Sequence, residues 1–222
     1  MQDNPSAYSA REYDRHIASV LPFYGEYHHQ VIDLVQSIGN PNPLWLDTGC
    51  GTGTLAARAL ETLPGARFTL CDPSEQMLRQ AEEKLRGQEV QFLMLSSQQI
   101  FFRGRFDVVT AIQCHHYLRP AERERAVRAC YHALKPGGVF VTFEHIRMSS
   151  PESDAIALLR WADYLKAHGC SDEEVQTQLD RRGREVLPIT GEEHLALLRS
   201  CGFRAADVLW ASYLQAGFWA IR

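Results

Sequence analysis

Three glycines at alternate positions follow a short apolar segment and a carboxylate between residues 44 and 56. The segment reads Leu-Trp-Leu-Asp-Thr-Gly-Cys-Gly-Thr-Gly-Thr-Leu-Ala, in which the glycines are Gly49, Gly51 and Gly53. Glycine lets the backbone turn sharply and approach a ligand closely. A helix that begins near Thr54 would direct free N–H groups and a positive dipole end into this turn. The pattern predicts a nucleotide-binding loop between a strand and a helix.

Two kinds of nucleotide compete for this loop. Gly51, Gly53 and Ala56 fit the dinucleotide fingerprint, and Asp72 follows at the expected distance of about 20 residues. Asp47, however, stands directly before the glycines, where its charge would repel a pyrophosphate. A carboxylate at this position suits the ammonium and sulfonium charges of S-adenosylmethionine. The charge argument therefore favours S-adenosylmethionine over a nicotinamide dinucleotide.

The residues 47–53, Asp-Thr-Gly-Cys-Gly-Thr-Gly, resemble motif I of the class I S-adenosylmethionine-dependent methyltransferases. Two more segments are similar to features of this family: residues 72–78, Asp-Pro-Ser-Glu-Gln-Met-Leu, and the turn Leu-Lys-Pro-Gly-Gly at 134–138. The resemblance implies a Rossmann-like fold, S-adenosylmethionine as cofactor and S-adenosylhomocysteine as product. It also implies a seven-stranded sheet whose last strand is antiparallel.

The resemblance also implies which residues contact the cofactor. Asp72 would bind the ribose hydroxyls, and Met77 would lie beside the adenine unless it is a core residue. Relatives carry Gly-Asp-Ala where this chain has Ser-Ser-Gln at 96–98, so Ser96 or Gln98 would replace the carboxylate that binds the adenine amino group. The expected cofactor-binding residues are Asp47, Gly49, Cys50, Gly51, Gly53, Asp72, Pro73, Met77, Ser96, Ser97, Gln98 and Gln113.

Histidines are the candidates for a catalytic base, because a neutral imidazole titrates near working pH. His115 and His116 follow an apolar strand predicted at 106–112, and the loop after such a strand lies at the ligand-binding edge of the sheet. His145 ends the following strand, next to Glu144, which could orient one of the histidines. We expect His115 to be the base. Tyr24, in an aromatic segment at 23–29, is a further candidate beside the ligand cleft.

Helical and strand patterns alternate along the chain, which predicts a doubly wound α/β sheet. An amphipathic pattern over 12–37 predicts helix interrupted at Pro22 and Gly25, after a loosely ordered start at 1–10. The charges of the helix that follows Pro120, Arg123 among them, are expected on a solvated face. Helices are expected at 54–63, 74–86 and 121–134, and strands at 44–46, 67–71, 90–95, 106–112, 139–145, 204–210 and 213–221.

We predict one domain over residues 1–222, with an N-terminal helical cap at 1–39 and a helical lid insertion at 147–189. Capping signals at Ser150, Ser171 and Thr190 mark helix starts in and after the insertion. Trp161 and Tyr164 could belong to its core or could line a pocket. The arginines at 181, 182 and 184 could favour a helix C-terminus or receive an anionic group.

The composition is that of a soluble globular protein, with 45% hydrophobic and 23% charged residues. A net charge of −4 gives no footprint for nucleic acid, and no apolar run reaches the roughly 18 residues of a membrane span. The polar start is no secretory signal, so we expect a cytoplasmic protein acting on a small molecule, with a homodimer as one possible assembly. The six cysteines form no C-x-x-C pair and are expected to be packing residues rather than metal ligands.

Four other functions are compatible with parts of the pattern. Within the same fold, the N-terminal segment with Tyr13-Asp14 and Pro22-Phe23-Tyr24-Gly25 resembles the carboxy-S-adenosylmethionine enzymes and those of tRNA wobble-uridine modification, which use S-adenosylmethionine or its carboxy derivative. The absence of a basic surface in the composition counts against an RNA substrate. Asp47 disfavours a nicotinamide-dependent oxidoreductase. A metalloenzyme using the three histidines and Glu144 is a weaker alternative, and a non-catalytic S-adenosylmethionine sensor would bind the cofactor without turnover.

Overall fold

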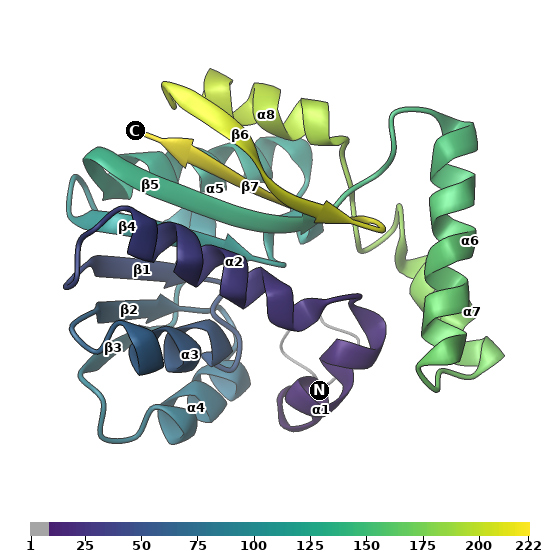
Figure 1. Ribbon diagram of the computed structural model, residues 1–222, viewed down its shortest axis with the longest axis horizontal. Helices are drawn as coiled ribbons and strands as arrows, with labels where there is room; N and C mark the ends of the chain where they lie inside the picture. The colour runs from purple at the N-terminus through teal and green to yellow at the C-terminus, as the bar shows by residue number, and fades with distance from the viewer. Residues whose placement is uncertain (1–8) are drawn as a thin grey trace.

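The computed structural model describes residues 9–222, in which a seven-stranded sheet is flanked by helices (Figure 1). The strands are β1 (Leu44–Thr48), β2 (Arg67–Cys71), β3 (Val90–Leu93), β4 (Phe106–Ile112), β5 (Leu134–His145), β6 (Ala205–Ser212) and β7 (Gln215–Ile221). The α-helices are α1 (Ala10–Val20), α2 (Tyr24–Ser37), α3 (Thr54–Thr62), α4 (Glu75–Lys84), α5 (Pro120–Ala133), α6 (Pro151–Ala167), α7 (Asp172–Arg181) and α8 (Gly191–Ser200). Two short 3-10 turns are η1 (Ser97–Gln99) and η2 (His115–Tyr117).

The strand order is β3-β2-β1-β4-β5-β7-β6, and β7 is antiparallel to both of its neighbours. The pairs among β1 to β5 are all parallel. This confirms the predicted doubly wound, seven-stranded sheet with an antiparallel last strand. The direction of winding reverses between β1 and β4, and open α/β sheets bind ligands at the carboxyl ends of their strands at such a point.

Two apolar layers cover the sheet. One lies under α2 and α3 and includes Tyr27 and Trp45, and the other lies under α5 and α8 and includes Phe140 and Leu198. The central strands are buried on both faces, which explains why β4 reads as a continuous apolar run. Because both faces are packed, the open carboxyl edge is where the sheet can hold a ligand.

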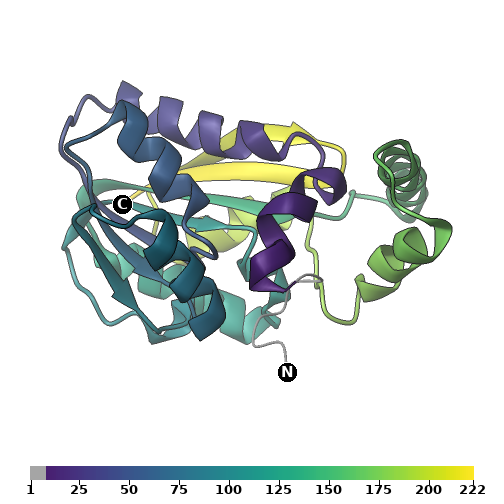
Figure 2. The same cartoon turned by 90° about the horizontal axis from the view of Figure 1, so that it is seen from below.

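The helices α6 and α7 project from that edge and stand beside α1 (Figures 1 and 2). A small separate core that includes Val20, Trp161, Leu165 and Leu214 holds them there. The indole N–H of Trp161 donates to the carbonyl of Val20 at 3.0 Å, and the Tyr164 hydroxyl donates to Ala18 O at 3.3 Å. The insertion therefore packs against the N-terminal helix and against the ends of β5 and the β6–β7 turn, where Trp161 meets His145 at 5.2 Å and Tyr164 meets Tyr213 at 5.4 Å between ring centroids.

Two expectations for the helices need correction. The N-terminal helix is broken at 21–23, where Phe23 has a left-handed backbone (φ 59°), whereas Gly25 lies inside α2. Arg123 is not on a solvated face: it is 3% exposed and donates to the carbonyls of His115, Leu118 and Leu187. It thereby ties α5 to η2 and to the segment after α7.

The helix-start signals read from the sequence are present in the structure. Ser150, Ser171 and Thr190 each accept a hydrogen bond from the main chain three residues later. The expected loose start at 1–10 falls mostly on residues 1–8, which lie outside the described part of the chain. Within residues 9–222 no helix has the length and apolar character needed to cross a membrane.

Candidate active site

The glycine loop between β1 and α3 has the close approaches that its sequence predicts. A Cβ on Gly49, which has φ 65°, would lie 2.5 Å from the Cβ of Cys114. Gly51 has φ 53°, and no atom lies within 4 Å of the place where its Cβ would be. Gly49 is therefore required by the neighbouring loop, whereas Gly51 leaves room for a ligand. Gly53 instead allows close packing of α3 on α4, since its Cβ would contact Ala81 at 3.1 Å.

Asp72 links this loop to the start of α4. Its Oδ2 accepts the N–H of Gly51 and its Oδ1 accepts the N–H of Ser74, both at 2.9 Å. The residue is 7% exposed and lines the first cleft. Each carboxylate oxygen can accept more than one hydrogen bond. Asp72 is thus held in place and can still accept hydroxyl groups.

This first cleft collects most of the residues expected to bind the cofactor. Among the expected residues, it is lined by Gly49, Gly51, Asp72, Pro73, Met77, Ser96, Ser97, Gln98 and Gln113. Asp47 and Cys50 line a smaller adjoining pocket on the other side of the glycine loop, and Gly53 lines neither. The structure thus brings residues from several separate sequence segments together in a single cleft.

The segment that replaces Gly-Asp-Ala supplies one amide to the cleft. The hydroxyl of Ser97 is 2.9 Å from that of Thr48, and the hydroxyl of Ser96 donates to Gln99 Oε1 at 2.9 Å. Gln98 lines the cleft with no side-chain hydrogen bond to the residues described. Gln98 therefore offers its amide to a ligand, whereas each serine hydroxyl already makes a contact within the protein.

Asp47 is buried at the end of β1, with 2% of its surface exposed. Burial raises its pKa to about 7, against the opposing effect of the Thr110 hydroxyl, which donates to Oδ1 at 2.6 Å. A buried carboxylate without a cation is costly, so a bound positive charge would favour its ionised form.

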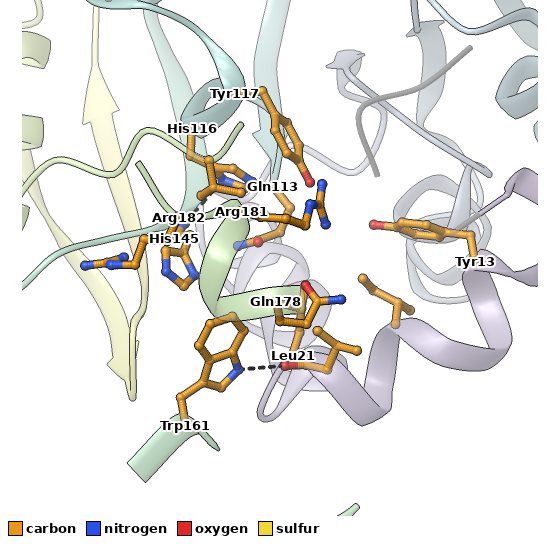
Figure 3. Close-up of a pocket in the computed structure, with 13 residues that line it drawn as sticks. Tyr13, Leu21, Gln113, His116, Tyr117, His145, Trp161, Gln178, Arg181 and Arg182 are labelled. Atoms are coloured by element: carbon orange, nitrogen blue, oxygen red, sulfur yellow. Dashed lines mark hydrogen bonds between the residues drawn. The ribbon is translucent and has the colours of Figure 1, made fainter. Parts of the chain in front are cut away.

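A second pocket adjoins the cleft and is lined in part by residues of α1, α6 and α7 (Figure 3). Tyr13, Gln113 and Tyr117 line both, so these three side chains form a shared wall. Gln113 is one of the few non-glycine residues with positive φ, at 56°, a conformation that clusters at functional sites. The remaining lining residues are Ile17, Val20, Leu21, His116, His145, Trp161, Gln178, Arg181, Arg182 and Val186.

His116 and Glu144 form a buried pair at the wall of the second pocket. Oε2 of Glu144 accepts the main-chain N–H of His116 and lies 2.9 Å from its ring Nδ1. Burial would raise the pKa of Glu144, but the hydrogen bond and charge of His116 outweigh it and lower the pKa to about 2. An ionised Glu144 accepts a hydrogen bond from Nδ1–H, which leaves the lone pair on Nε2. The main-chain N–H of His145 also lies near Nδ1, but at 3.3 Å it is the weaker contact. In residues 9–222, Nε2 has no hydrogen-bond partner.

Comparisons with known proteins place this geometry in a family. Residues 46–140 match the family model described as a methyltransferase domain. A methyltransferase of Methanosarcina mazei that depends on S-adenosylmethionine superposes with a TM-score of 0.64 at 19% identity, over 85% of this chain and 96% of that one. One from Thermotoga maritima gives 0.62 at 16% identity, over 95% and 94%. The chain is therefore similar to the methyltransferases in sequence over residues 46–140, and to these two solved structures in fold over most of its length.

Several relatives that are similar in sequence bear the same name. A carboxy-S-adenosyl-L-methionine synthase of Nautilia profundicola is 25% identical over 209 residues, which cover 90% of this chain and 89% of the relative. One of Hydrogenovibrio crunogenus is 28% identical over 198 residues, covering 86% and 77%. With the domain match, these relatives confirm the expectation of an enzyme that uses S-adenosylmethionine.

Within the methyltransferase domain, the histidine expected as the base lies elsewhere. His115 lines neither the cleft nor the second pocket; its ring is 2% exposed and stacks near Phe140, 6.3 Å between centroids. Burial lowers its pKa to about 4. The neighbouring His116 occupies the position that the sequence assigned to His115, because η2 turns only one of the two rings towards the pocket.

His145 and Tyr24 fall on opposite sides of the methyltransferase cleft. His145 lines the second pocket, and its Nδ1 is 3.0 Å from Nε2 of Gln215. Tyr24 lies beside Asp47 and the glycine loop, packed edge-on against His28 at 4.8 Å between centroids. Tyr24 is therefore on the cofactor side and does not line the second pocket. In the described residues no group of three His, Cys, Asp or Glu is arranged to hold a metal.

Three further residues of the methyltransferase site had no distinct signal in the sequence. Tyr13 lies in α1, more than thirty residues before the glycine loop, and lines the cleft and both adjoining pockets. Tyr117 closes the shared wall from η2. Gln215 begins β7 and accepts the amide N–H of Gln113 at 2.9 Å. All three reach the site through contacts between segments distant in sequence.

Proposed function

We propose that this enzyme transfers the methyl group of S-adenosylmethionine to a small molecule bound in the second pocket. The observation that carries the proposal is the shared wall of Tyr13, Gln113 and Tyr117, which joins the cleft to the pocket. A cofactor seated in the cleft would have its reactive end at this wall. The acceptor would approach from the side of α6 and α7.

The residues of the cleft fit the cofactor. Gly51 leaves space for close approach of a ligand to the loop, and Asp72 is held so that it can accept ribose hydroxyls. The buried carboxyl of Asp47 suits the positive end of the molecule, and the amide of Gln98 suits the adenine edge. When bound, S-adenosylmethionine supplies a methyl carbon already activated by its sulfonium.

The chain's own tasks are then to position the acceptor and to receive its proton. Correct positioning can supply about 7–11 kcal/mol of a barrier. Nε2 of His116 can accept a proton from a hydroxyl or ammonium group in the second pocket, and ionised Glu144 stabilises the imidazolium that forms. The apolar lining, which includes Ile17, Leu21 and Trp161, reduces the access of water.

Calorimetry and product analysis test this proposal. S-adenosylmethionine and S-adenosylhomocysteine should bind, and NAD should not, because Asp47 opposes a pyrophosphate. Incubation with S-adenosylmethionine and pools of small hydroxyl and amine compounds should release S-adenosylhomocysteine together with a methylated acceptor. Tight binding of NAD without binding of the adenosyl compounds would overturn the proposal.

A second candidate is carboxylation of the methyl group of S-adenosylmethionine, as the name of the relatives suggests. The second pocket carries arginines that suit a carboxylate. Nε of Arg181 is held by Glu185 at 2.7 Å, and its guanidinium points towards Tyr117 (Figure 3). The charge of Arg182 is already matched by a bidentate pair with Asp154 at 2.7 and 2.8 Å. This activity would supply the carboxy derivative used in wobble-uridine modification.

The fate of the nucleoside separates the two candidates. Methyl transfer converts S-adenosylmethionine into S-adenosylhomocysteine, whereas carboxylation yields a heavier sulfonium nucleoside. Mass spectrometry of the nucleoside after incubation with pools of small carboxylic acids distinguishes these products. Arg181→Met should abolish carboxylation, while Arg160→Met, on the outer side of α6 over Tyr213, is the matched control.

A further inference from the structure

Two histidines line the second pocket, each near the carboxyl end of one of two neighbouring strands. His116 lies in η2 after β4, and His145 ends β5; their ring centroids are 6.4 Å apart. Both are nearly buried, at 3% and 4% exposure. Because the two rings face one small pocket, a molecule bound there can contact both. Glu144 and Gln215 each contact Nδ1 of their histidine, but the carboxylate of Glu144 accepts there whereas the amide N–H of Gln215 donates.

The partner of His145 is an amide rather than a carboxylate. Gln113 donates its side-chain N–H to Oε1 of Gln215 at 2.9 Å, and Nε2 of Gln215 lies 3.0 Å from Nδ1 of His145. An amide NH₂ group can only donate, so Nδ1 of His145 accepts and the ring proton lies on Nε2. Gln215 is 1% exposed and is thus well sequestered from competing water.

The Nε2 atom of His145 is buried and has no hydrogen-bond partner in the described part of the chain. A buried N–H without a partner is destabilising, and in a pocket wall it is suited to donate to an acceptor atom of a ligand. Burial lowers the pKa of His145 well below its usual range, with Arg182 adding to the effect. The ring is therefore a neutral donor and not a base.

We propose that His145 donates an Nε2–H hydrogen bond to the acceptor, next to the atom that His116 deprotonates. This inference rests on the proposed methyl transfer and names the class of its acceptor. The favoured molecule has a hydroxyl group adjacent to a carbonyl or carboxylate oxygen. His116 Nε2 takes the hydroxyl proton, the resulting oxygen attacks the methyl carbon as its bond to sulfur breaks, and the neighbouring oxygen accepts from His145.

The apolar side of the pocket fits the remainder of such a molecule. Ile17, Val20 and Leu21 of the N-terminal segment line the pocket together with Trp161 of α6, whose indole N–H donates to the carbonyl of Val20 at 3.0 Å. An aromatic ring would bury its faces there while both oxygens meet the histidines. The acceptor is thus a small aromatic or enolic hydroxyl compound with an adjacent oxygen.

The position of the ring proton can be tested without substrate. In long-range ¹H–¹⁵N spectra of the whole protein, His145 should show a protonated Nε2 and an unprotonated Nδ1. Gln215→Glu replaces the donor by a carboxylate, so the proton should move to Nδ1. Gln178→Glu places the same charge in the same pocket without a hydrogen bond to His145 and should leave the proton on Nε2. A proton on Nδ1 in the unaltered protein would mean that the side-chain amide of Gln215 accepts from His145 instead of donating to it. This result would overturn the proposal.

The acceptor class is tested with two isomeric probes in the presence of S-adenosylhomocysteine. 2-Hydroxybenzoate carries the adjacent pair of oxygens, whereas 4-hydroxybenzoate separates them. We expect about tenfold tighter binding of the 2-isomer, which corresponds to about 1.4 kcal/mol. The preference should vanish in His145→Leu and persist in His145→Gln, which keeps an N–H donor. Equal affinity for both isomers, or a preference that survives His145→Leu, would refute the acceptor class.

These measurements distinguish a failure of the acceptor class from a failure of the proposed function. If S-adenosylhomocysteine binds but the isomers are not distinguished, the cofactor site stands and the role of His145 is wrong. If S-adenosylhomocysteine itself does not bind, the methyl-transfer proposal fails first. The spectra of the cofactor-free protein give the ring proton in either case.

Discussion

Glu144 holds His116 by two atoms at once, with its Oε2 2.9 Å from both the main-chain nitrogen and the ring Nδ1. The hydroxyl of Thr142 donates to the other carboxylate oxygen at 2.5 Å. The ring can therefore neither flip nor exchange its proton position without breaking a buried charged hydrogen bond, so its Nε2 stays turned to the pocket.

This pair predicts the effect of removing the base. His116→Ala should lower the rate of methyl transfer by about 10²–10⁴-fold, because proton removal from the acceptor is lost. Affinity for S-adenosylhomocysteine should change little, since His116 does not line the cleft. The matched control is His115→Phe, which keeps an aromatic ring against Phe140 and should retain the rate. A normal rate in His116→Ala would show that catalysis depends on positioning alone.

Asp72 should affect both the cofactor and the fold. Asp72→Ala removes charge-assisted hydrogen bonds of about 1.5–3 kcal/mol each, so cofactor affinity should fall at least about tenfold. Because Asp72 also accepts the N–H groups of Gly51 and Ser74, the melting temperature should fall as well.

Asp107 provides the matched control for this change. It accepts the N–H of Leu44 and pairs with Lys135 at the opposite edge of the sheet. Asp107→Ala should therefore lower the melting temperature without changing the dissociation constant. Thermal unfolding and calorimetry on both variants separate the two effects, and equal affinity in both would mean that the ribose is bound by other residues.

The sequence predicted the sheet and the cleft because those features depend on local signals. Each local pattern indicates its own surroundings: the glycine spacing a ligand loop, Asp72 the end of a strand, and the apolar run from Phe106 to Ile112 a buried strand. Parallel strands then bring their carboxyl ends to one edge of the sheet. The wall segments of the cleft follow from that topology, which explains why Met77 and Gln98 both line it.

The second pocket was not predictable in the same way. Its wall combines residues of α1, η2, the end of β5, α6 and α7. These segments are distant in sequence and are brought together by contacts such as that of Trp161 in α6 with Val20 in α1. The choice between His115 and His116 depends on a turn of three residues, and both side chains follow the same strand. Arg123 was expected in solvent, because nothing in its helix shows that three carbonyls of other segments surround it.

Gly51 and Gly137 allow a test of ligand contact against backbone strain. Both have positive φ, at 53° and 81°, and neither would place a Cβ within 4 Å of another atom. Alanine should cost each about 1 kcal/mol or somewhat more in stability through strain. Only Gly51→Ala would also place a methyl group in the cofactor cleft. We expect cofactor affinity to fall by at least about tenfold in Gly51→Ala alone, measured by calorimetry with unfolding curves for both variants.

Asp47 predicts that cofactor binding depends on pH. Burial raises its pKa in the folded protein from the ordinary 3.8 to about 7, so much of it is protonated in mildly acidic solution. Because the positive end of S-adenosylmethionine favours the carboxylate, binding should release a proton, and affinity should rise by up to about tenfold per pH unit from pH 5 to pH 7. His28, which also lines that pocket, has a pKa lowered to about 3 and stays neutral over this range.

Stability should change with pH in the opposite direction. The folded state retains the proton of Asp47 between about pH 4 and pH 7, whereas the unfolded chain has lost it, so unfolding becomes easier as pH rises through this window. Asp47→Asn removes both effects, because the amide does not titrate. Calorimetry in buffers of different ionisation enthalpy counts the released proton, and thermal unfolding of the cofactor-free protein follows the stability. A dissociation constant that is flat from pH 5 to pH 7 in the unaltered protein would mean that Asp47 does not face the positive charge of the cofactor.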